Sequence, residues 1–237
     1  YSRKLSDQLS LGVAIRYINS NLAGGAAVNG VSYKAGQSVA GDITLFYTTM
    51  NETGSGWNFG AAFTNLGTKI GYTDDPSQKD FIPANMGLGA VYTKTFQEVH
   101  KVSFGLDVMK LMVPTPPELG DSAGLVKYRS QGVVPSWFTS FADAPGGFSE
   151  ELQEFYFAMG SEYWYNNQFA FRLGYFHENE NKGNRQYFTM GTGIKYNIFG
   201  LNFSYLIPSG SGVNRNPLSN TIRFSLIFDF DGNSGEE

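Results

Sequence analysis

Few side chains in this sequence could do acid–base or nucleophilic chemistry. It contains two histidines and no cysteine, which excludes disulfides, thiolate metal ligands and a cysteine nucleophile. His177 opens the run 177–181, where a histidine base with a serine and an acid would make an esterase-like hydrolase. No serine stands at a recognisable spacing from His177, so we expect no catalytic residues. His100 precedes Lys101 in a predicted short turn, and we expect it to be solvated.

Acidic residues that could bind a hard cation occur at 74–75, at 150–151 and in the run 177–181. The Asp-x-Asp-x-Asp-Gly spacing of a calcium loop is absent from all of them. We therefore expect solvated loop acids, with no metal site and no cofactor. The net charge is −4 and there is no block of Lys or Arg, which argues against nucleic acid as a partner.

The elements that position these residues are predicted to be strands. Charged residues make up only 16% of the chain, against about 25% in an average soluble domain, while aromatic residues also reach 16%. Helical periodicity hardly appears, and apolar residues alternate with small or polar ones with a period of two. The sequence predicts ten strands, centred on residues 11–17, 39–47, 57–64, 86–92, 102–109, 155–163, 169–175, 188–198, 201–207 and 222–230.

The connections between these strands alternate between longer and shorter ones. This alternation is typical of outer-membrane barrels, whose periplasmic turns are tight and whose external loops are free to grow. A soluble antiparallel sheet would also have a period of two, but its polar positions would be rich in Lys and Glu rather than Gly, Ala, Ser and Asn. We predict an all-β, transmembrane antiparallel β-barrel that forms a single domain over residues 1–237, with both chain ends on the periplasmic side.

Three local expectations follow from the same pattern. Gly200 alone is predicted to break the chain between two late strands, and residues 1–5 are predicted to be the tail of an earlier strand. Lys94 and Lys110 occupy strand positions whose side chains should lie on the apolar face, and both are near predicted strand ends. We expect their side chains to extend toward the membrane interface.

Strand parity assigns the remaining charged residues of the strands to the lumen. Equal numbers of both signs do not form the one-sided ring of an ion-selective pore. Because charges in a low-dielectric interior must be paired, we predict an ion-pair network that fills the lumen. Its members are Arg16, Asp42, Asp107, Glu154, Glu162, Arg172, Lys195 and Arg223.

The connection over residues 113–150 is predicted to be a long external loop, and loops of this length are uncommon unless they are functional. It is rich in proline and carries aromatic residues that are too apolar for a segment without a partner. The loop is predicted to bind a partner, or to fold onto the barrel mouth as a lid, and the two roles do not exclude each other. The candidate partner-binding residues are Pro114, Pro116, Trp137, Phe138, Phe141, Asp143, Pro145 and Phe148.

Several segments resemble a known family. Residues 1–17 resemble the PorV/PorQ family of Bacteroidetes outer-membrane proteins, and five later segments resemble its PorV branch, also called LptO from a proposed link to lipopolysaccharide deacylation. These segments are 143–152, 162–166, 174–178, 182–189 and 216–226, of which 143–152 is the most specific. The resemblance implies a FadL-like barrel of about fourteen strands, of which this chain would supply about ten.

The resemblance also implies a function in type IX secretion, in the outer membrane of a Gram-negative bacterium. Members of the family are expected to act as cargo shuttles without enzymatic activity. They would receive the C-terminal signal domain of cargo at the SprA (Sov) translocon and deliver it to the attachment complex with the sortase PorU, in contact with outer-membrane lipid and lipopolysaccharide. Two alternatives remain open: a FadL-like channel for hydrophobic solutes, favoured by Phe46, Met109, Phe176 and Leu206 at lumen positions, and a lipid-A-type esterase that uses His177.

Overall fold

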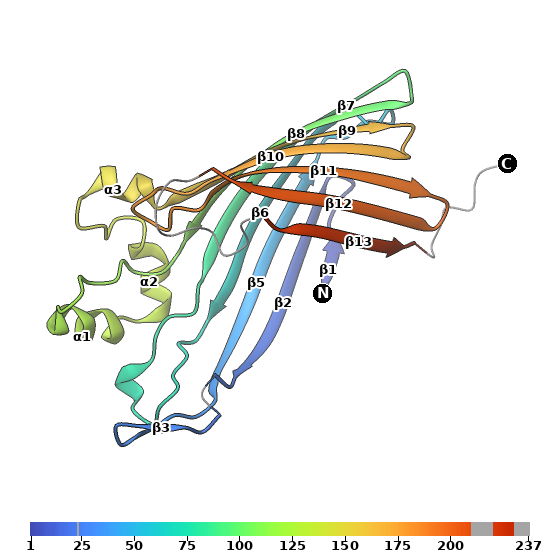
Figure 1. The fold of residues 1–237 in the computed structure, drawn as a ribbon. Helices are drawn as coiled ribbons and strands as arrows, with labels where there is room; N and C mark the ends of the chain where they lie inside the picture. Colours follow the sequence, from blue (N-terminus) through green and yellow to red (C-terminus); the bar gives the residue numbers. More distant parts are fainter. Residues whose placement is uncertain (23, 210–219, 230–237) are drawn as a thin grey trace. The chain divides into compact units, whose positions relative to one another are not determined.

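The computed structural model describes residues 1–237 except 23, 210–219 and 230–237. Its main element is an eleven-stranded sheet with the strand order β1-β2-β5-β6-β7-β8-β9-β10-β11-β12-β13 (Figure 1). The strands are β1 (Ser2–Lys4), β2 (Leu9–Ser20), β5 (Gly36–Thr48), β6 (Gly56–Gly67), β7 (Asn85–Phe96), β8 (His100–Leu111), β9 (Phe155–Tyr165), β10 (Phe169–His177), β11 (Gln186–Tyr196), β12 (Phe199–Pro208) and β13 (Ile222–Phe228). A separate hairpin pairs β3 (Ala27–Val28) with β4 (Val31–Ser32).

The predicted all-β fold class is confirmed, and each of the ten predicted strands is present. Residues 1–5 contain the additional strand β1, which pairs antiparallel with β2. Neighbouring strands from β9 to β13 are also antiparallel. Within the described residues, β1 and β13 are the two ends of the strand order and are not paired with each other. A single barrel domain over 1–237 stays a prediction.

The chain divides into two compact units. The first comprises residues 1–46, 60–88 and 109–155, and the second comprises 47–59, 89–108 and 156–237.

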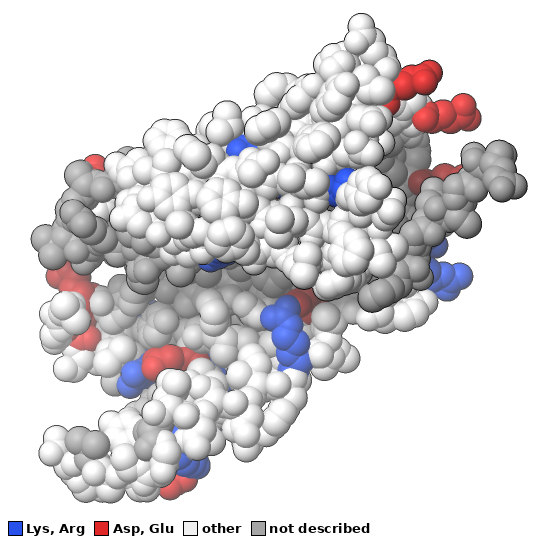
Figure 2. Space-filling model, turned by 45° about the vertical axis from the view of Figure 1, so that its right-hand side comes forward, with Lys and Arg blue, Asp and Glu red and all other residues white. Residues whose placement is uncertain are grey.

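In the first part of β5, small and polar residues are buried and large apolar ones are exposed. In β5, Ser38, Ala40 and Asp42 are at most 8% exposed, whereas Val39 and Ile43 are 51% and 45% exposed. On the face shown in Figure 2, charged side chains are scattered and most of the surface is uncharged. A large exposed apolar surface is rare on soluble monomers, and strands with apolar outer faces are typical of outer-membrane barrels.

The shorter connections are turns that require unusual backbone conformations. Gln97 and Glu98 have φ of 52° and 60° in the turn before β8, and Asn166 and Asn167 have φ of 52° and 50° in the turn before β10. Two successive residues at positive φ form the type I′ turn that matches the twist of a hairpin.

The predicted break at Gly200 was wrong. Gly200 lies inside β12 and pairs with Lys195 of β11, while the turn is made by residues 197–198 with Asn197 at a φ of 49°. Asparagine tolerates the left-handed conformation through its short polar side chain, so this turn does not need a glycine.

The longest connection contains helices that the sequence did not predict. Between β8 and β9 lie α1 (Ser122–Ser130), α2 (Val133–Thr139) and α3 (Phe148–Gln153) (Figure 1). A 3-10 turn, η1 (Pro76–Gln78), lies in the connection between β6 and β7. Helices of two turns show too few residues for a helical period to stand out. None of the helices in the described part of the chain is long and apolar enough to cross a membrane.

Two predicted segments lie partly outside the described residues. They are the connection predicted over 209–217 and the start of the family-like segment 216–226. Residue 230, at the end of the last predicted strand, also lies outside them.

Candidate functional site

The helical connection of the first unit is centred on a buried lysine. The side chain of Lys110, near the end of β8, is fully buried, and its Nζ lies 2.8 Å from Glu151 Oε1 and 2.5 Å from Glu154 Oε2. The carboxylates come from α3 and from the residue that follows it. Lys110 therefore joins the end of strand β8 to the end of the connection, 44 residues further along the chain at Glu154.

Three further residues, Thr115, Asp143 and Ala144, complete this Lys110 cluster. The Thr115 backbone N–H donates to Asp143 Oδ2 at 3.1 Å, and its hydroxyl lies 3.1 Å from both Asp143 Oδ1 and Glu154 Oε1. The Ala144 N–H donates to Glu151 Oε2 at 3.3 Å. The start of the connection, residues 143–144 and the end of the connection are thus bound to one another by buried and half-buried polar contacts.

The Lys110 cluster holds three carboxylates around one ammonium group. Oxygen atoms of Asp143, Glu151 and Glu154 lie within 4.8 Å of one another, a spacing that could hold a cation. The Lys110 ammonium already contacts two of these carboxylates, so the chain supplies its own cation there. The prediction that Lys110 extends toward the interface was wrong, because the connection folds over it.

A second set of contacts attaches α1 to the connection between β6 and β7. Arg129 Nε donates to Asp80 Oδ1 at 2.9 Å, and Lys69 Nζ donates to the carbonyls of Arg129 and Gln131 at 2.7 and 2.6 Å. Burial lowers the pKa of Lys69, and the nearby Asp80 carboxylate partly opposes this shift. The α1 segment is therefore attached at its C-terminal end.

The helix α2 is held by hydroxyl groups that bond to its own backbone. Ser136 and Ser140 are fully buried, and their hydroxyls donate to the carbonyls of Val133 at 2.6 Å and Trp137 at 3.1 Å. Buried hydroxyls of this kind are satisfied without a partner outside the helix. One side of α2 is thus closely packed.

Other residues of the connection are left open to solvent. Phe138 of α2 is 74% exposed and Phe148 of α3 is 78% exposed. Phe141, Pro116 and Pro145 are also exposed, whereas Trp137 and Asp143 are half-buried and Pro114 is buried. The predicted partner-binding residues therefore divide between those that pack within the connection and those, chiefly Phe138 and Phe148, that offer apolar surface. We call these two side chains the exposed phenylalanine pair.

The predicted lumen charges form separate pairs. Arg16 forms an ion pair with Asp42, and its Nη1 donates to Asn65 at 2.8 Å in the first unit. In the second unit, Arg172 Nε lies 2.6 Å from Glu162 Oε2, and Lys195 pairs with Asp229 at 3.2 Å.

The remaining members are placed differently. Glu154 forms an ion pair with Lys110, which was not among the predicted lumen residues. Within the described residues, Asp107 and Arg223 are in no ion pair, and both are exposed. A continuous network that fills the lumen stays a prediction.

The two histidines have aromatic neighbours. His100 is half-buried, its Nδ1 lies 2.7 Å from the Tyr163 hydroxyl, and its ring stacks on Phe96 at 5.1 Å, so the prediction of a solvated side chain was wrong. His177 Nδ1 lies 3.3 Å from the Tyr175 hydroxyl. No serine hydroxyl or carboxylate bonds to His177 among the described residues.

The acidic run 177–181 contains one organised carboxylate. Both oxygens of Glu178 accept from Arg185, at 2.7 Å each from Nε and Nη2. These bonds raise the pKa of the Arg185 guanidinium and occupy the carboxylate that sequence analysis considered for a cation. The other acid of the run, Glu180, is exposed.

The sequence did not predict that Lys110, Thr115 and Glu151 belong to one cluster of polar contacts. The one available signal was a lysine at an apolar parity position, which indicates either an interfacial side chain or a buried ion pair. The acidic pair 150–151 supplied the possible partner but lies far away in sequence.

A search of curated proteins finds no match. Residues 1–118 match the model of the family described as type IX secretion system protein PorV, whose members are outer-membrane proteins of that system. The match covers β1 to β8 and the first residues of the helical connection. The chain therefore belongs to the PorV family of type IX secretion system proteins.

Proposed function

We propose that this chain is a non-enzymatic shuttle of type IX secretion, which binds the C-terminal signal domain of cargo as it emerges from the SprA (Sov) translocon. It would then carry the cargo to the attachment complex that contains the sortase PorU. The observation that carries this proposal is the exposed phenylalanine pair on a connection that the Lys110 cluster holds in place. Family membership supports the secretion system as its setting.

The exposed phenylalanine pair has the properties of an interaction surface. Aromatic side chains are enriched among the residues that contribute most to binding, and rigid positioning lowers the entropic cost of association. Phe148 begins α3, which also carries the buried Glu151 of the Lys110 cluster. Phe148 is therefore tied to a fixed part of the connection.

The test is a binding experiment with purified signal domain. In the variant Phe138→Ser with Phe148→Ser, we expect the affinity for the signal domain to fall at least tenfold. Each aromatic side chain that is buried in an interface contributes about 1 kcal/mol or more to binding. The matched control is Leu119→Ser, which removes a fully exposed apolar side chain from the same connection. Unchanged binding by the double variant, or equal loss by the control, would refute the assignment.

A channel for hydrophobic solutes is a weaker candidate. It requires a continuous apolar path through the interior, and Phe176 is one of the positions that favoured it. Phe176 stacks on Tyr187 with ring centroids 4.9 Å apart and contacts Tyr156 at 5.8 Å, while the Arg185 guanidinium lies 5.6 Å from its ring. Phe176 therefore packs against these side chains instead of lining an open apolar path. This counts against the channel and favours the shuttle.

A further inference from the structure

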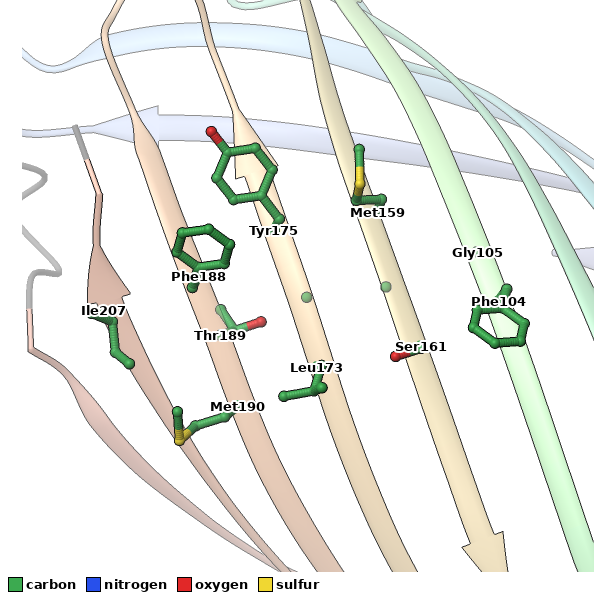
Figure 3. A pocket seen from close by; sticks show the side chains of 12 residues that line it. Phe104, Gly105, Met159, Ser161, Leu173, Tyr175, Phe188, Thr189, Met190 and Ile207 are labelled. Carbon is green, nitrogen blue, oxygen red and sulfur yellow. The ribbon is translucent and has the colours of Figure 1, made fainter.

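The second unit contains an apolar hollow that takes no part in the proposed shuttle. Its volume is about 630 Å³, and residues of β8 to β12 line it. Phe104, Met159, Leu173 and Phe188 contribute side chains to its walls (Figure 3). None of the described residues that line it is charged.

The hollow opens on the apolar face of the strands. Met159 and Leu173 are 52% and 64% exposed. Arg172, the next residue to Leu173, turns to the opposite face and pairs with Glu162. Side chains of neighbouring residues in a strand point to opposite faces, so the hollow and the ion pair lie on opposite sides of the sheet.

The hollow lies at mid-strand. Met159 is the fifth of eleven residues in β9, and Leu173 is the fifth of nine in β10. Strands of about 9–11 residues cross the hydrocarbon layer of a bilayer when tilted. Residues at the middle of these strands therefore face hydrocarbon in an outer-membrane protein.

Small residues create the hollow. Gly160 lies opposite Gly174, and Ser161 lies opposite Leu173. Figure 3 shows Ser161 between Leu173 and Phe104, where its short side chain leaves space that a large one would fill.

One end of the hollow carries a polar group. Tyr175 packs on Phe188 with ring centroids 4.7 Å apart, and its hydroxyl lies 3.3 Å from His177 Nδ1 at the end of β10. This end of β10 leads into the connection 178–185, which is longer than the turn at its other end, 166–168. Longer connections of outer-membrane barrels are external, so the polar end points toward the outer leaflet.

We propose that this hollow binds one hydrocarbon chain of an outer-leaflet lipid, with the lipid's polar linkage near Tyr175 and His177. The uncharged lining, the position at mid-strand and the polar group at the external end all match an acyl chain attached to a headgroup. Such a lipid is retained when the surrounding membrane is replaced by mild detergent. The proposal does not depend on cargo binding.

The test measures lipid that stays with the full chain after purification from native membranes in mild detergent. Mass spectrometry of the intact protein is expected to find about one bound lipid. Ser161→Phe fills the hollow and should lower retention by about tenfold. The matched control is Thr192→Phe, an exposed position on β11 that does not line the hollow, and it should retain lipid as the unmodified chain does. Equal retention by Ser161→Phe, equal loss by Thr192→Phe, or no retained lipid in the unmodified chain would overturn the proposal.

A second variant tests the same position even if Ser161→Phe prevents the protein from folding. Because the sequence has no cysteine, Ser161→Cys can fold first and then be alkylated with a phenyl maleimide, and alkylation should displace the lipid. In native membranes, a benzophenone attached to the same cysteine is expected to form lipid adducts. A protein adduct at position 161, absent when the probe is at position 192, would show that a protein covers the hollow and would overturn the proposal.

Discussion

Replacing Lys110 with methionine tests whether the Lys110 cluster holds the helical connection in place. Methionine preserves much of the side-chain length and removes the ammonium group. Glu151 and Glu154 then lose the partner that lies 2.8 and 2.5 Å away. Their side chains are only 6% and 14% exposed, so solvent screens the loss weakly.

The size of the effect follows from the burial of the pair. Removing one partner of a buried ion pair costs about 3–5 kcal/mol, and each 1.4 kcal/mol corresponds to a factor of ten. Local opening of α3 should therefore become about 150 to 4,000 times more frequent. Amide hydrogen exchange measures this opening directly.

The reporters are the amides of α3 and its C-terminal residue, because the N–H groups of Glu150, Glu151 and Glu154 are hydrogen-bonded within this turn. Lys127→Met, at an exposed position of α1, is the matched control and should leave their exchange unchanged. A companion variant, Lys110→Met with Glu154→Gln, also removes the negative charge of Glu154 and should recover part of the protection. Unaltered exchange of α3 in folded Lys110→Met would refute the role given to the cluster.

Three further predictions concern other parts of the chain. Gly193→Ala would place a Cβ 2.6 Å from Asn202 Oδ1, and we expect the free energy of unfolding to fall by about 1–3 kcal/mol. The loss is measured as a lower melting temperature in micelles. Gly60→Ala, whose Cβ would have no described atom within 4 Å, should have a much smaller effect. Arg129→Ala removes the ion pair to Asp80, which is half exposed, so stability should fall by no more than about 1 kcal/mol while trypsin cleavage around α1 accelerates. The purified protein should show no large, salt-independent single-channel conductance if paired charges fill its lumen, and such a conductance would contradict that prediction.

The strands could be predicted because one local rule determines them. The alternation of Phe169, Phe171 and Leu173 with Ala170 and Arg172 is visible within five residues, and the structure places the first three on the exposed face. The same rule assigned Arg172 and Glu162 to one face, where they form an ion pair. Parity does not identify partners, however, and Glu154 pairs with Lys110, which the same rule had not assigned to the lumen.

The helical connection could not be predicted because its contacts are distant in sequence. Whether Lys110 reaches an interface or is buried depends on where Glu151 lies, and periodicity carries no information about that. The short helices also rest on local bonds, such as the Asp121 carboxylate that accepts from Gly124 N at 2.8 Å, rather than on a repeated pattern. The aromatic residues of the segment indicated an interaction surface, but their division between packed Trp137 and exposed Phe138 required the fold.

The central claim is that this chain binds secretion cargo through the exposed phenylalanine pair. The most direct measurement is affinity purification of the intact protein from native membranes, beside the variant Phe138→Ser with Phe148→Ser, with all captured proteins identified. We expect the unmodified protein to bring down the very large translocon barrel and cargo that carries a C-terminal signal domain, and the variant to lose the cargo. Capture of cargo by both proteins in equal amounts, or by neither, would contradict the claim.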